Sequence, residues 1–185
     1  MLNAHNPTVT LVPATEADAP LLGDLIEEYA LELSAVFPNV VRGSDGRFGY
    51  SRLPLYWSEP DRRFAFVIRA DGAVAGFALA TRGSPAAADP SVLDVAEFFV
   101  LRPYRRLGVG RLAARLLWSR LPGTWTVRVA EANRGGLAFW ADVLREAALA
   151  PTATALVNPD GRAWRVYTFD AATPGGTANV DGGTR

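Results

Sequence analysis

The chain has 185 residues, nineteen acidic and nineteen basic side chains, and an apolar share of 49%. These values fit one globular domain and exclude a global charge that would draw the protein onto nucleic acid or an anionic membrane. The sequence has no cysteine, no lysine and one histidine, His5, which excludes disulfides, thiolate nucleophiles, Schiff bases and a Walker A loop.

The only histidine lies near the N-terminus, so we expect neither a Ser/His/Asp triad nor a metal site. The first ten residues lack the basic and apolar segments of a signal peptide. No apolar run approaches the roughly 18 residues of a membrane span. We therefore expect a cytoplasmic protein, monomeric or homodimeric, without nucleic-acid or membrane partners.

The first predicted elements are a strand over residues 9 to 12 and a helix after Thr15, which forms a capping pair with Asp18. One face of this helix is apolar, formed by Leu22, Leu25, Ile26, Tyr29 and Leu33. Another is acidic, formed by Asp24, Glu27, Glu28 and Glu32. The acidic face is either a solvated surface or a wall that attracts a cationic substrate.

The segment from residue 37 to 60 has an irregular pattern with several glycines and prolines. It carries four aromatic residues that the pattern places at the surface: Phe48, Tyr50, Tyr56 and Trp57. Long loops of this kind are often functional. The alternative is that these aromatics pack a second short helix against the core.

Two apolar runs, 64 to 69 and 74 to 80, flank an Asp-Gly pair and predict a β-hairpin. A small, polar loop follows over residues 82 to 90. The next run, 95 to 100, has the aromatic and β-branched content of a buried strand. It leads into a loop that contains three arginines and Pro103.

A helix is predicted from Gly108 to residue 120, where Leu121-Pro122-Gly123 stops it. The unit therefore reads strand, basic glycine loop, helix. Such a unit directs backbone N–H groups and the positive end of a helix dipole at one point, which suits a pyrophosphate or a similar anion. Arg105 and Arg106 add charge at the mouth of the loop.

The remaining pattern predicts a strand over 124 to 129 and a helix that follows Asn133 and ends near residue 150. A last hairpin pairs residues 152 to 157 with 163 to 169. Beyond it the composition is Gly, Thr, Ala and Pro with little apolar bulk. We expect one domain over residues 1 to 170 and a disordered tail over 171 to 185.

The glycine loop satisfies the pattern G-x-G-x-x-A from Gly108, and Glu131 lies 23 residues further on, as a dinucleotide-binding fingerprint requires. In that fold the first glycine directly follows the strand. Here seven residues, 101 to 107, intervene. We therefore do not favour a dinucleotide oxidoreductase, although the pattern permits one.

The stretch from Arg105 to Gly110, RRLGVG, closely resembles motif A of the GNAT acyltransferase superfamily. Asn133 and the later Phe139-Trp140 pair agree with a second family motif, and the phrase EFFVLRPYRRLGVG looks like a bacterial branch. The resemblance covers most of residues 8 to 169. It implies an α+β GNAT fold of three αβα layers, with a mixed, mostly antiparallel sheet of six or seven strands flanked by about four helices.

The resemblance also implies acetyl-CoA as the donor. By position, the N–H groups of Arg106, Leu107, Gly108, Val109, Gly110 and Arg111 would hold the pyrophosphate, assisted by Arg105 and Arg106. Phe99 and Val100 would offer main-chain groups to the pantetheine arm, and Asn133, Phe139 and Trp140 would line its other side. Only glycine lets a backbone approach phosphate oxygens without a Cβ clash, which supports this placement independently.

Acetyl transfer to an amine needs a general base, because an amine with a pKa of about 10.4 is mostly protonated at neutral pH. Glu97 is the first candidate, since it interrupts an apolar strand where burial would raise its pKa. The alternative is that it is solvated or paired with an arginine. Glu131 is the second candidate and Asp94 the third.

Many family members use a tyrosine in the later helix to protonate the leaving thiolate, and that position holds Trp140, whose indole cannot act as an acid. Tyr50, Tyr56, Tyr104 or water could replace it. Without cysteine, direct transfer in a ternary complex to a primary amine of a small molecule or peptide follows. A non-catalytic module that binds an acyl-CoA is the alternative.

Overall fold

The computed structural model describes residues 6–158 and 161–171. In these residues seven strands form one sheet in the order β1-β2-β3-β4-β5-β7-β6, with four helices beside it. Among the strands of the described residues, only the β4–β5 pair is parallel. The strands are β1 Val9–Pro13, β2 Arg63–Ala70, β3 Ala73–Arg82, β4 Leu93–Val100, β5 Gly123–Ala130, β6 Thr152–Val157 and β7 Ala163–Ala171; the helices are α1 Ala19–Ser34, α2 Leu55–Ser58, α3 Val109–Arg120 and α4 Arg134–Glu146.

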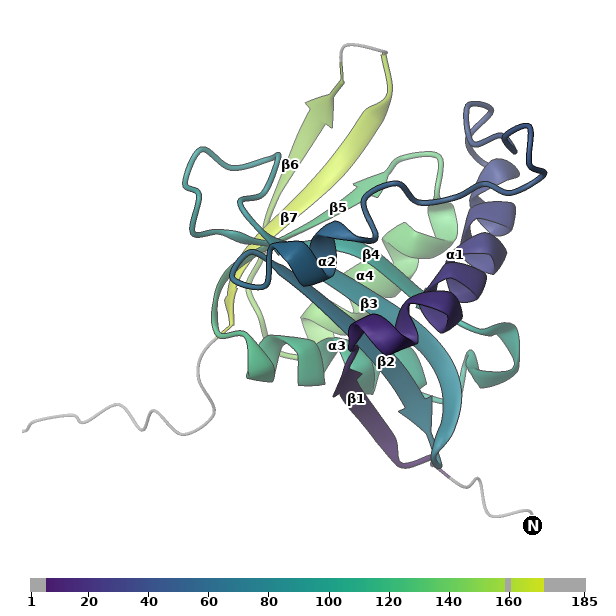
Figure 1. The fold of residues 1–185 in the computed structure, drawn as a ribbon. Helices are drawn as coiled ribbons and strands as arrows, with labels where there is room; N and C mark the ends of the chain where they lie inside the picture. The colour runs from purple at the N-terminus through teal and green to yellow at the C-terminus, as the bar shows by residue number, and fades with distance from the viewer. Residues whose placement is uncertain (1–5, 159–160, 172–185) are drawn as a thin grey trace, which may run out of the picture.

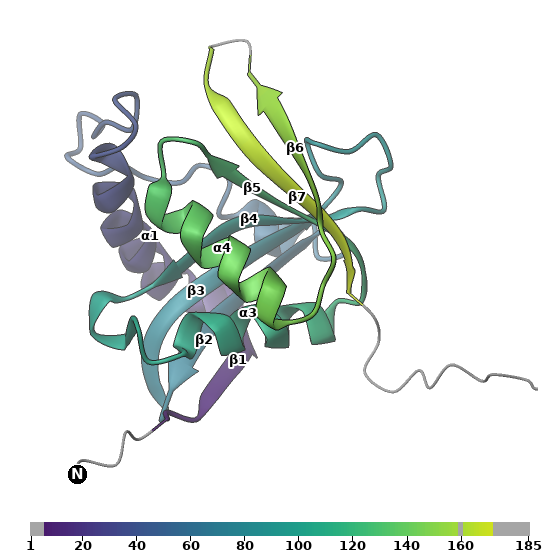
Figure 2. The same ribbon diagram turned by 180° about the vertical axis from the view of Figure 1, so that it is seen from behind.

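The helices cover both faces of the sheet. Figure 1 shows α1 and α2 in front of it, and Figure 2, from behind, shows α3 and α4 on the opposite face. Two buried clusters separate accordingly, one containing Leu22, Phe77 and Phe99 on the α1 side and one containing Leu117 and Trp125 on the α3/α4 side. The predicted α+β class with three layers and a mixed, mostly antiparallel sheet is confirmed.

The sheet separates at its parallel pair. β4 and β5 are paired only where Leu93, Asp94 and Val95 face Trp125, Thr126 and Val127. Beyond this point β4 continues to Val100 and β5 to Ala130, and the two strands diverge (Figure 1). The main-chain groups of β4 and β5 that would otherwise pair with each other are therefore not joined beyond Val95 and Val127.

A β-bulge lies at the same place. The register between β3 and β4 shifts so that Leu79 faces Glu97 and Ala80 faces Val95, which leaves Ala96 as the extra residue. Side chains of a regular strand alternate between faces. The bulge therefore interrupts this alternation, and Glu97 joins Asp94 on the α1 face instead of following Val95 into the α3/α4 core.

Several boundaries differ from the sequence predictions. Thr15 and Asp18 do form a capping pair, but it closes a 3-10 turn over Glu16–Asp18, and α1 begins at Ala19. The helix α4 ends at Glu146 rather than near residue 150, because Ala148 adopts a positive φ of 54°. Of the two alternatives for the aromatic segment, packing holds for Tyr56, which lies on the short helix α2 and is 4% exposed in the α1-side core.

The end of the chain bears on the predicted domain boundary. β7 continues to Ala171, one residue past the predicted end of the domain. Most of the predicted tail, from residue 172 on, lies outside the described residues, as does His5. Among the helices that are described, none combines the length and apolar character needed to cross a bilayer.

Candidate active site

The loop between β4 and α3 presents a row of unpaired backbone donors. Arg106 and Gly108 both have left-handed φ values, 65° and 79°, and α3 begins at Val109. Within the described part of the chain, no acceptor is bonded to the N–H groups of Arg106 through Arg111. Leu107 is exposed and Val109 is fully buried. The loop therefore offers a concave set of donors at the positive end of a twelve-residue helix.

Gly110 allows α3 to pack closely on α4. A Cβ at this position would meet the Phe139 ring at 3.1 Å and a Val100 methyl at 3.5 Å. Phe139 in turn stacks on Phe98 of β4, with ring centroids 5.8 Å apart. The predicted residues Val100, Gly110 and Phe139 thus meet at one point beside the opening between β4 and β5.

The two adjacent arginines differ in their partners. Arg105 Nη2 donates to both carboxylate oxygens of Glu32 at 2.9 and 3.0 Å, and its Nε donates to the Val100 carbonyl at 2.6 Å. Its guanidinium also lies over the Phe99 ring. Arg106 is exposed and, among the described residues, has no ion pair. Arg105 therefore holds the loop against α1 and β4, and Arg106 is the cation that remains available.

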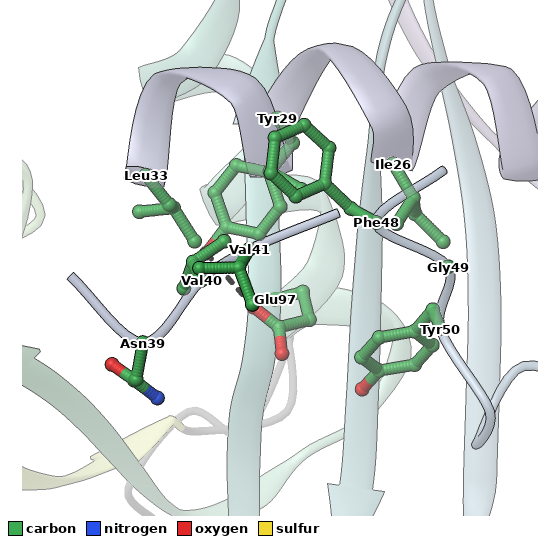
Figure 3. Close-up of a pocket in the computed structure, with 11 residues that line it drawn as sticks. Ile26, Tyr29, Leu33, Asn39, Val40, Val41, Phe48, Gly49, Tyr50 and Glu97 are labelled. Atoms are coloured by element: carbon green, nitrogen blue, oxygen red, sulfur yellow. Dashed lines mark hydrogen bonds between the residues drawn. The ribbon is translucent and has the colours of Figure 1, made fainter. Parts of the chain in front are cut away.

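Glu97 lies in a pocket of about 270 Å³ on the α1 face of the sheet. Figure 3 shows its carboxylate pointing into the space between α1 and the loop that bears Tyr50. The rest of the lining is largely apolar: Ile26, Tyr29, Ala30, Leu33, Asn39, Val40, Val41, Phe48, Gly49 and Tyr50. A single carboxylate in such surroundings is suited to accept a proton from a ligand that enters the pocket.

The surroundings of Glu97 favour its neutral form. Burial raises the pKa of Glu97 above its ordinary value, and hydrogen bonding from Tyr29 together with the nearby Arg128 partly opposes that shift. The Tyr29 hydroxyl donates to Glu97 Oε2 at 2.8 Å. Burial likewise raises the pKa of Tyr50 above its usual range, so this phenol stays protonated beside the carboxylate. The raised pKa brings Glu97 toward the range useful for a general base.

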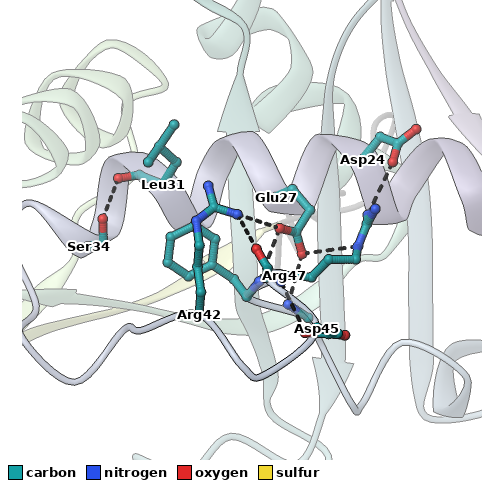
Figure 4. A network of polar contacts seen from close by, with 10 residues as sticks. Asp24, Glu27, Leu31, Ser34, Arg42, Asp45 and Arg47 are labelled. Atoms are coloured by element: carbon teal, nitrogen blue, oxygen red, sulfur yellow. Dashed lines mark hydrogen bonds and ion pairs between the residues drawn. The ribbon is translucent and has the colours of Figure 1, made fainter.

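The loop that closes this pocket is fastened to α1 through Glu27. Its carboxylate accepts the backbone N–H groups of Gly49 at 2.8 Å and Phe48 at 3.0 Å. Arg42 and Arg47 also reach it (Figure 4). These loop N–H groups, despite some opposing desolvation, hold the pKa of Glu27 below its usual value. The sequence pattern gave no sign of this role.

The other acidic residues of α1 are mostly paired within the chain. Asp24 is bridged to Arg47 at 3.2 Å, and Glu32 binds Arg102 and Arg105. Burial raises the pKa of Glu32, but these two arginines outweigh burial and hold that pKa below its ordinary value. The acidic residues of α1 therefore mainly form ion pairs that hold other segments of the chain against this helix.

Asp94, the third candidate base, is fully buried in a closed network. Its oxygens accept from Thr126 Oγ1 at 2.7 Å, from Ser84 at 3.3 Å and from Arg128 Nη2 at 2.7 Å. Glu131, the second candidate, is bridged to Arg165 at 3.0 Å and does not line the Glu97 pocket. Of the three carboxylates, the structure places only Glu97 in that pocket.

Asn133 and Trp140 have structural partners. Asn133 caps α4, because its Oδ1 accepts from the Gly136 N–H at 2.9 Å. Trp140 is 7% exposed and packs against Phe98 and Trp118 in the α3/α4 core. Of the tyrosines considered as its replacement, Tyr104 packs on that same core, whereas Tyr50 lines the Glu97 pocket.

Comparison with known proteins gives one family and one fold. The model of the acetyltransferase (GNAT) family matches residues 27–143, more than half of the chain. No curated protein matches the sequence. Among similar solved structures, an acetyltransferase from Thermus thermophilus has 19% sequence identity and a TM-score of 0.60, and the match covers 89% of this chain and 97% of that one. The ribosomal-protein-S18-alanine N-acetyltransferase from Escherichia coli has 17% identity and a TM-score of 0.57, with coverage of 92% of this chain and 98% of that one. The structure of yncA from Salmonella typhimurium with its cofactor acetyl-CoA has 17% identity and a TM-score of 0.57, with coverage of 87% of this chain and 91% of that one.

Proposed function

The chain belongs to the GNAT acetyltransferase family, and from this premise we propose that it moves an acetyl group from acetyl-CoA to a primary amine by direct transfer in a ternary complex. The acceptor is a small molecule or a peptide. The observation that carries the proposal is Glu97, a carboxylate alone in an apolar pocket at the end of the sheet where β4 and β5 diverge.

The residues around the loop before α3 fit the donor. The unbonded N–H groups from Arg106 to Arg111 match the oxygens of a pyrophosphate, and the Arg106 side chain adds a charge. Gly108 and Gly110 allow the close approach, because one has a left-handed φ and the other touches Phe139. Acetyl-CoA, when bound, supplies an acetyl group activated as a thioester.

The acceptor pocket supplies the proton chemistry. An incoming ammonium loses a proton to Glu97, and its nitrogen then forms a bond to the acetyl carbon as the carbon–sulfur bond breaks. The amine gives up a second proton, and the departing sulfur takes one to leave as a thiol. Tyr29 donates to Glu97 Oε2 and orients the carboxylate, and Tyr50, the second phenol that lines this pocket, orients the carboxylate or a water beside it.

The sequence supports direct transfer. The chain has no cysteine, and neither a cysteine nor a histidine lines the Glu97 pocket. A covalent acetyl-enzyme would need such a nucleophile. Both substrates therefore bind together, the donor at the loop before α3 and the acceptor beneath α1.

Calorimetric titration with acetyl-CoA tests the donor half of this proposal. We expect binding by the parent that weakens at least several-fold in Arg106→Gln and is unchanged in Arg115→Gln, an exposed arginine elsewhere on α3. Binding followed by CoA release only when an amine is added supports the transferase. Binding of acetyl-CoA without release of CoA in the presence of any amine identifies an acyl-CoA-binding module instead. Binding of NADH but not of acetyl-CoA supports the dinucleotide oxidoreductase.

A further inference from the structure

A second pocket, of about 130 Å³, lies next to the Glu97 pocket on the same face of the sheet. We infer that it binds an anionic group of the acceptor, a carboxylate or a phosphate, so that the substrate is an amine that also carries such a group. This inference rests on the proposed function. The volume is below the roughly 300 Å³ of a complete small-molecule site, so the pocket suits one functional group.

The lining of this pocket is strongly basic in a chain whose net charge is zero. Five arginines face two carboxylates, which leaves three positive charges uncompensated. The charged lining residues are Arg52, Arg62, Arg63, Arg82, Arg128, Glu59 and Asp94. Arginine binds carboxylate and phosphate through a planar fork of donors, so such a lining selects an anion over a cation.

The pairing of these side chains leaves donors available. Arg128 is held by Asp94 through Nε and Nη2, and Arg63 is held by Glu59 through Nε at 2.8 Å. Arg52 and Arg62 are exposed and have no ion pair within the described residues. The pocket thus combines two fixed arginines in its wall with two free ones at its rim.

A buried polar atom also points to a ligand. Tyr56 lines this pocket and is only 4% exposed, and its hydroxyl lies near Tyr50 and Arg63 without forming a well-aligned hydrogen bond to any described group. A buried hydroxyl without a partner is costly to the folded protein. A bound carboxylate or phosphate oxygen would accept from it.

The two pockets are joined by Tyr50, which lines both of them. Arg128 in the second pocket is close enough to Glu97 in the first for each to affect the other's ionisation. An acceptor can therefore place its amine beside Glu97, its apolar body against residues such as Leu33 and Val40, and its anionic group among the arginines. An α-amino acid with an apolar side chain has this arrangement of groups.

The test uses apolar amines prepared in matched sets. Each amine is supplied as the carboxylate, as the phosphonate and as the uncharged amide, so that only the anionic group varies. Binding is measured by calorimetry with CoA present, and turnover is measured as CoA released from acetyl-CoA. The variants are Arg52→Gln/Arg62→Gln, Tyr56→Phe and, as a control distant from both pockets, Arg115→Gln.

We expect the parent to favour carboxylate or phosphonate over amide by at least tenfold in Kd and in kcat/KM. The double arginine variant should lose this preference and keep the parent's thermal unfolding midpoint. Tyr56→Phe should also bind the anionic members more weakly while unfolding at the same or a higher temperature, which a merely structural role would not produce. The better of the two anionic forms identifies the group recognised.

The inference is overturned if the parent shows the same Kd and kcat/KM for the charged and uncharged amines. It is also overturned if the double arginine variant keeps the parent's preference for the anionic forms. CoA release with amides alone would also overturn it while leaving the transferase intact. If no amine releases CoA, the proposed function fails, and the calorimetric preference still decides whether the pocket binds an anion.

Discussion

The hydroxyl of Tyr29, on α1, donates a 2.8 Å hydrogen bond to Glu97 Oε2, on β4. The two residues are 68 positions apart in the sequence, and the bond joins a helix to the strand it covers. Tyr29 also packs edge-on against Phe77 at 5.8 Å, which fixes its ring. The orientation and the ionisation of the proposed base therefore depend on a residue of the opposite layer.

Replacing Tyr29 by Phe removes this donor. A hydrogen bond to the charged carboxylate stabilises that form, so its loss raises the pKa of Glu97 further. The limb of the kcat/KM profile that rises with pH should therefore move to higher pH. Tyr104→Phe, on the other side of the sheet, is the matched control. A limb that stays in place or moves to lower pH in Tyr29→Phe contradicts the assignment.

Glu97→Gln should change stability as well as activity. Burial raises the folded-state pKa of Glu97 above its unfolded value, so folding binds a proton in the window between the two, and stability is lost as pH rises through the folded pKa. The neutral amide avoids that loss and can still accept from Tyr29. Thermal unfolding should show Glu97→Gln more stable than the parent at pH 8, with the difference shrinking toward pH 4. A stability difference between Glu97→Gln and the parent that does not change with pH would contradict this prediction.

Glu27→Gln should loosen the loop over the acceptor pocket. The carboxylate accepts two backbone N–H groups and lies near two arginines, and a hydrogen bond to a charged group contributes about 1.5–3 kcal/mol. We expect the acceptor KM to rise about tenfold and the Kd for acetyl-CoA to stay unchanged. Glu28→Gln, exposed on the same helix, is the control. An unchanged acceptor KM in Glu27→Gln would show that the loop does not depend on this anchor.

Gly110→Ala should weaken donor binding. The added methyl would lie 3.1 Å from the Phe139 ring, and relieving such overpacking typically costs about 1–3 kcal/mol. The shift would displace the start of α3, whose N–H groups face the proposed pyrophosphate. Calorimetry should show a weaker Kd for acetyl-CoA in Gly110→Ala and partial recovery in Gly110→Ala/Phe139→Leu. If the added Phe139→Leu change restores no affinity, the weaker binding of Gly110→Ala does not arise from its contact with Phe139.

Most of the fold could be predicted because its signals are local. The Asp71-Gly72 turn, the switch to helical spacing after Gly108 and the stop at Pro122 each fix one element from a few adjacent residues. The sheet class and the layers then follow from the order of elements. The boundaries that failed depend on tertiary contacts or backbone details such as the positive φ of Ala148.

The site was less predictable. Glu97 stands out because it interrupts an apolar strand, but the face it occupies depends on the bulge at Ala96, which no local pattern signals. The anchoring of the loop by Glu27 and the gathering of distant arginines such as Arg52 and Arg128 are products of folding. Arg105, which we expect to assist at the pyrophosphate, also binds Glu32, and this pairing between distant residues was not predictable from the local pattern.

The pH dependence of amine-stimulated CoA release in the parent and in Glu97→Gln tests most directly whether Glu97 is the general base. The parent should release CoA only with amine, along a limb that rises at a pH above the ordinary range of a glutamate. The variant should be about 10²–10⁴-fold slower and lack that limb, because a positioned base contributes about this factor. A variant that keeps the parent's rate and pH profile would show that Glu97 is not the base and would remove it from the mechanism.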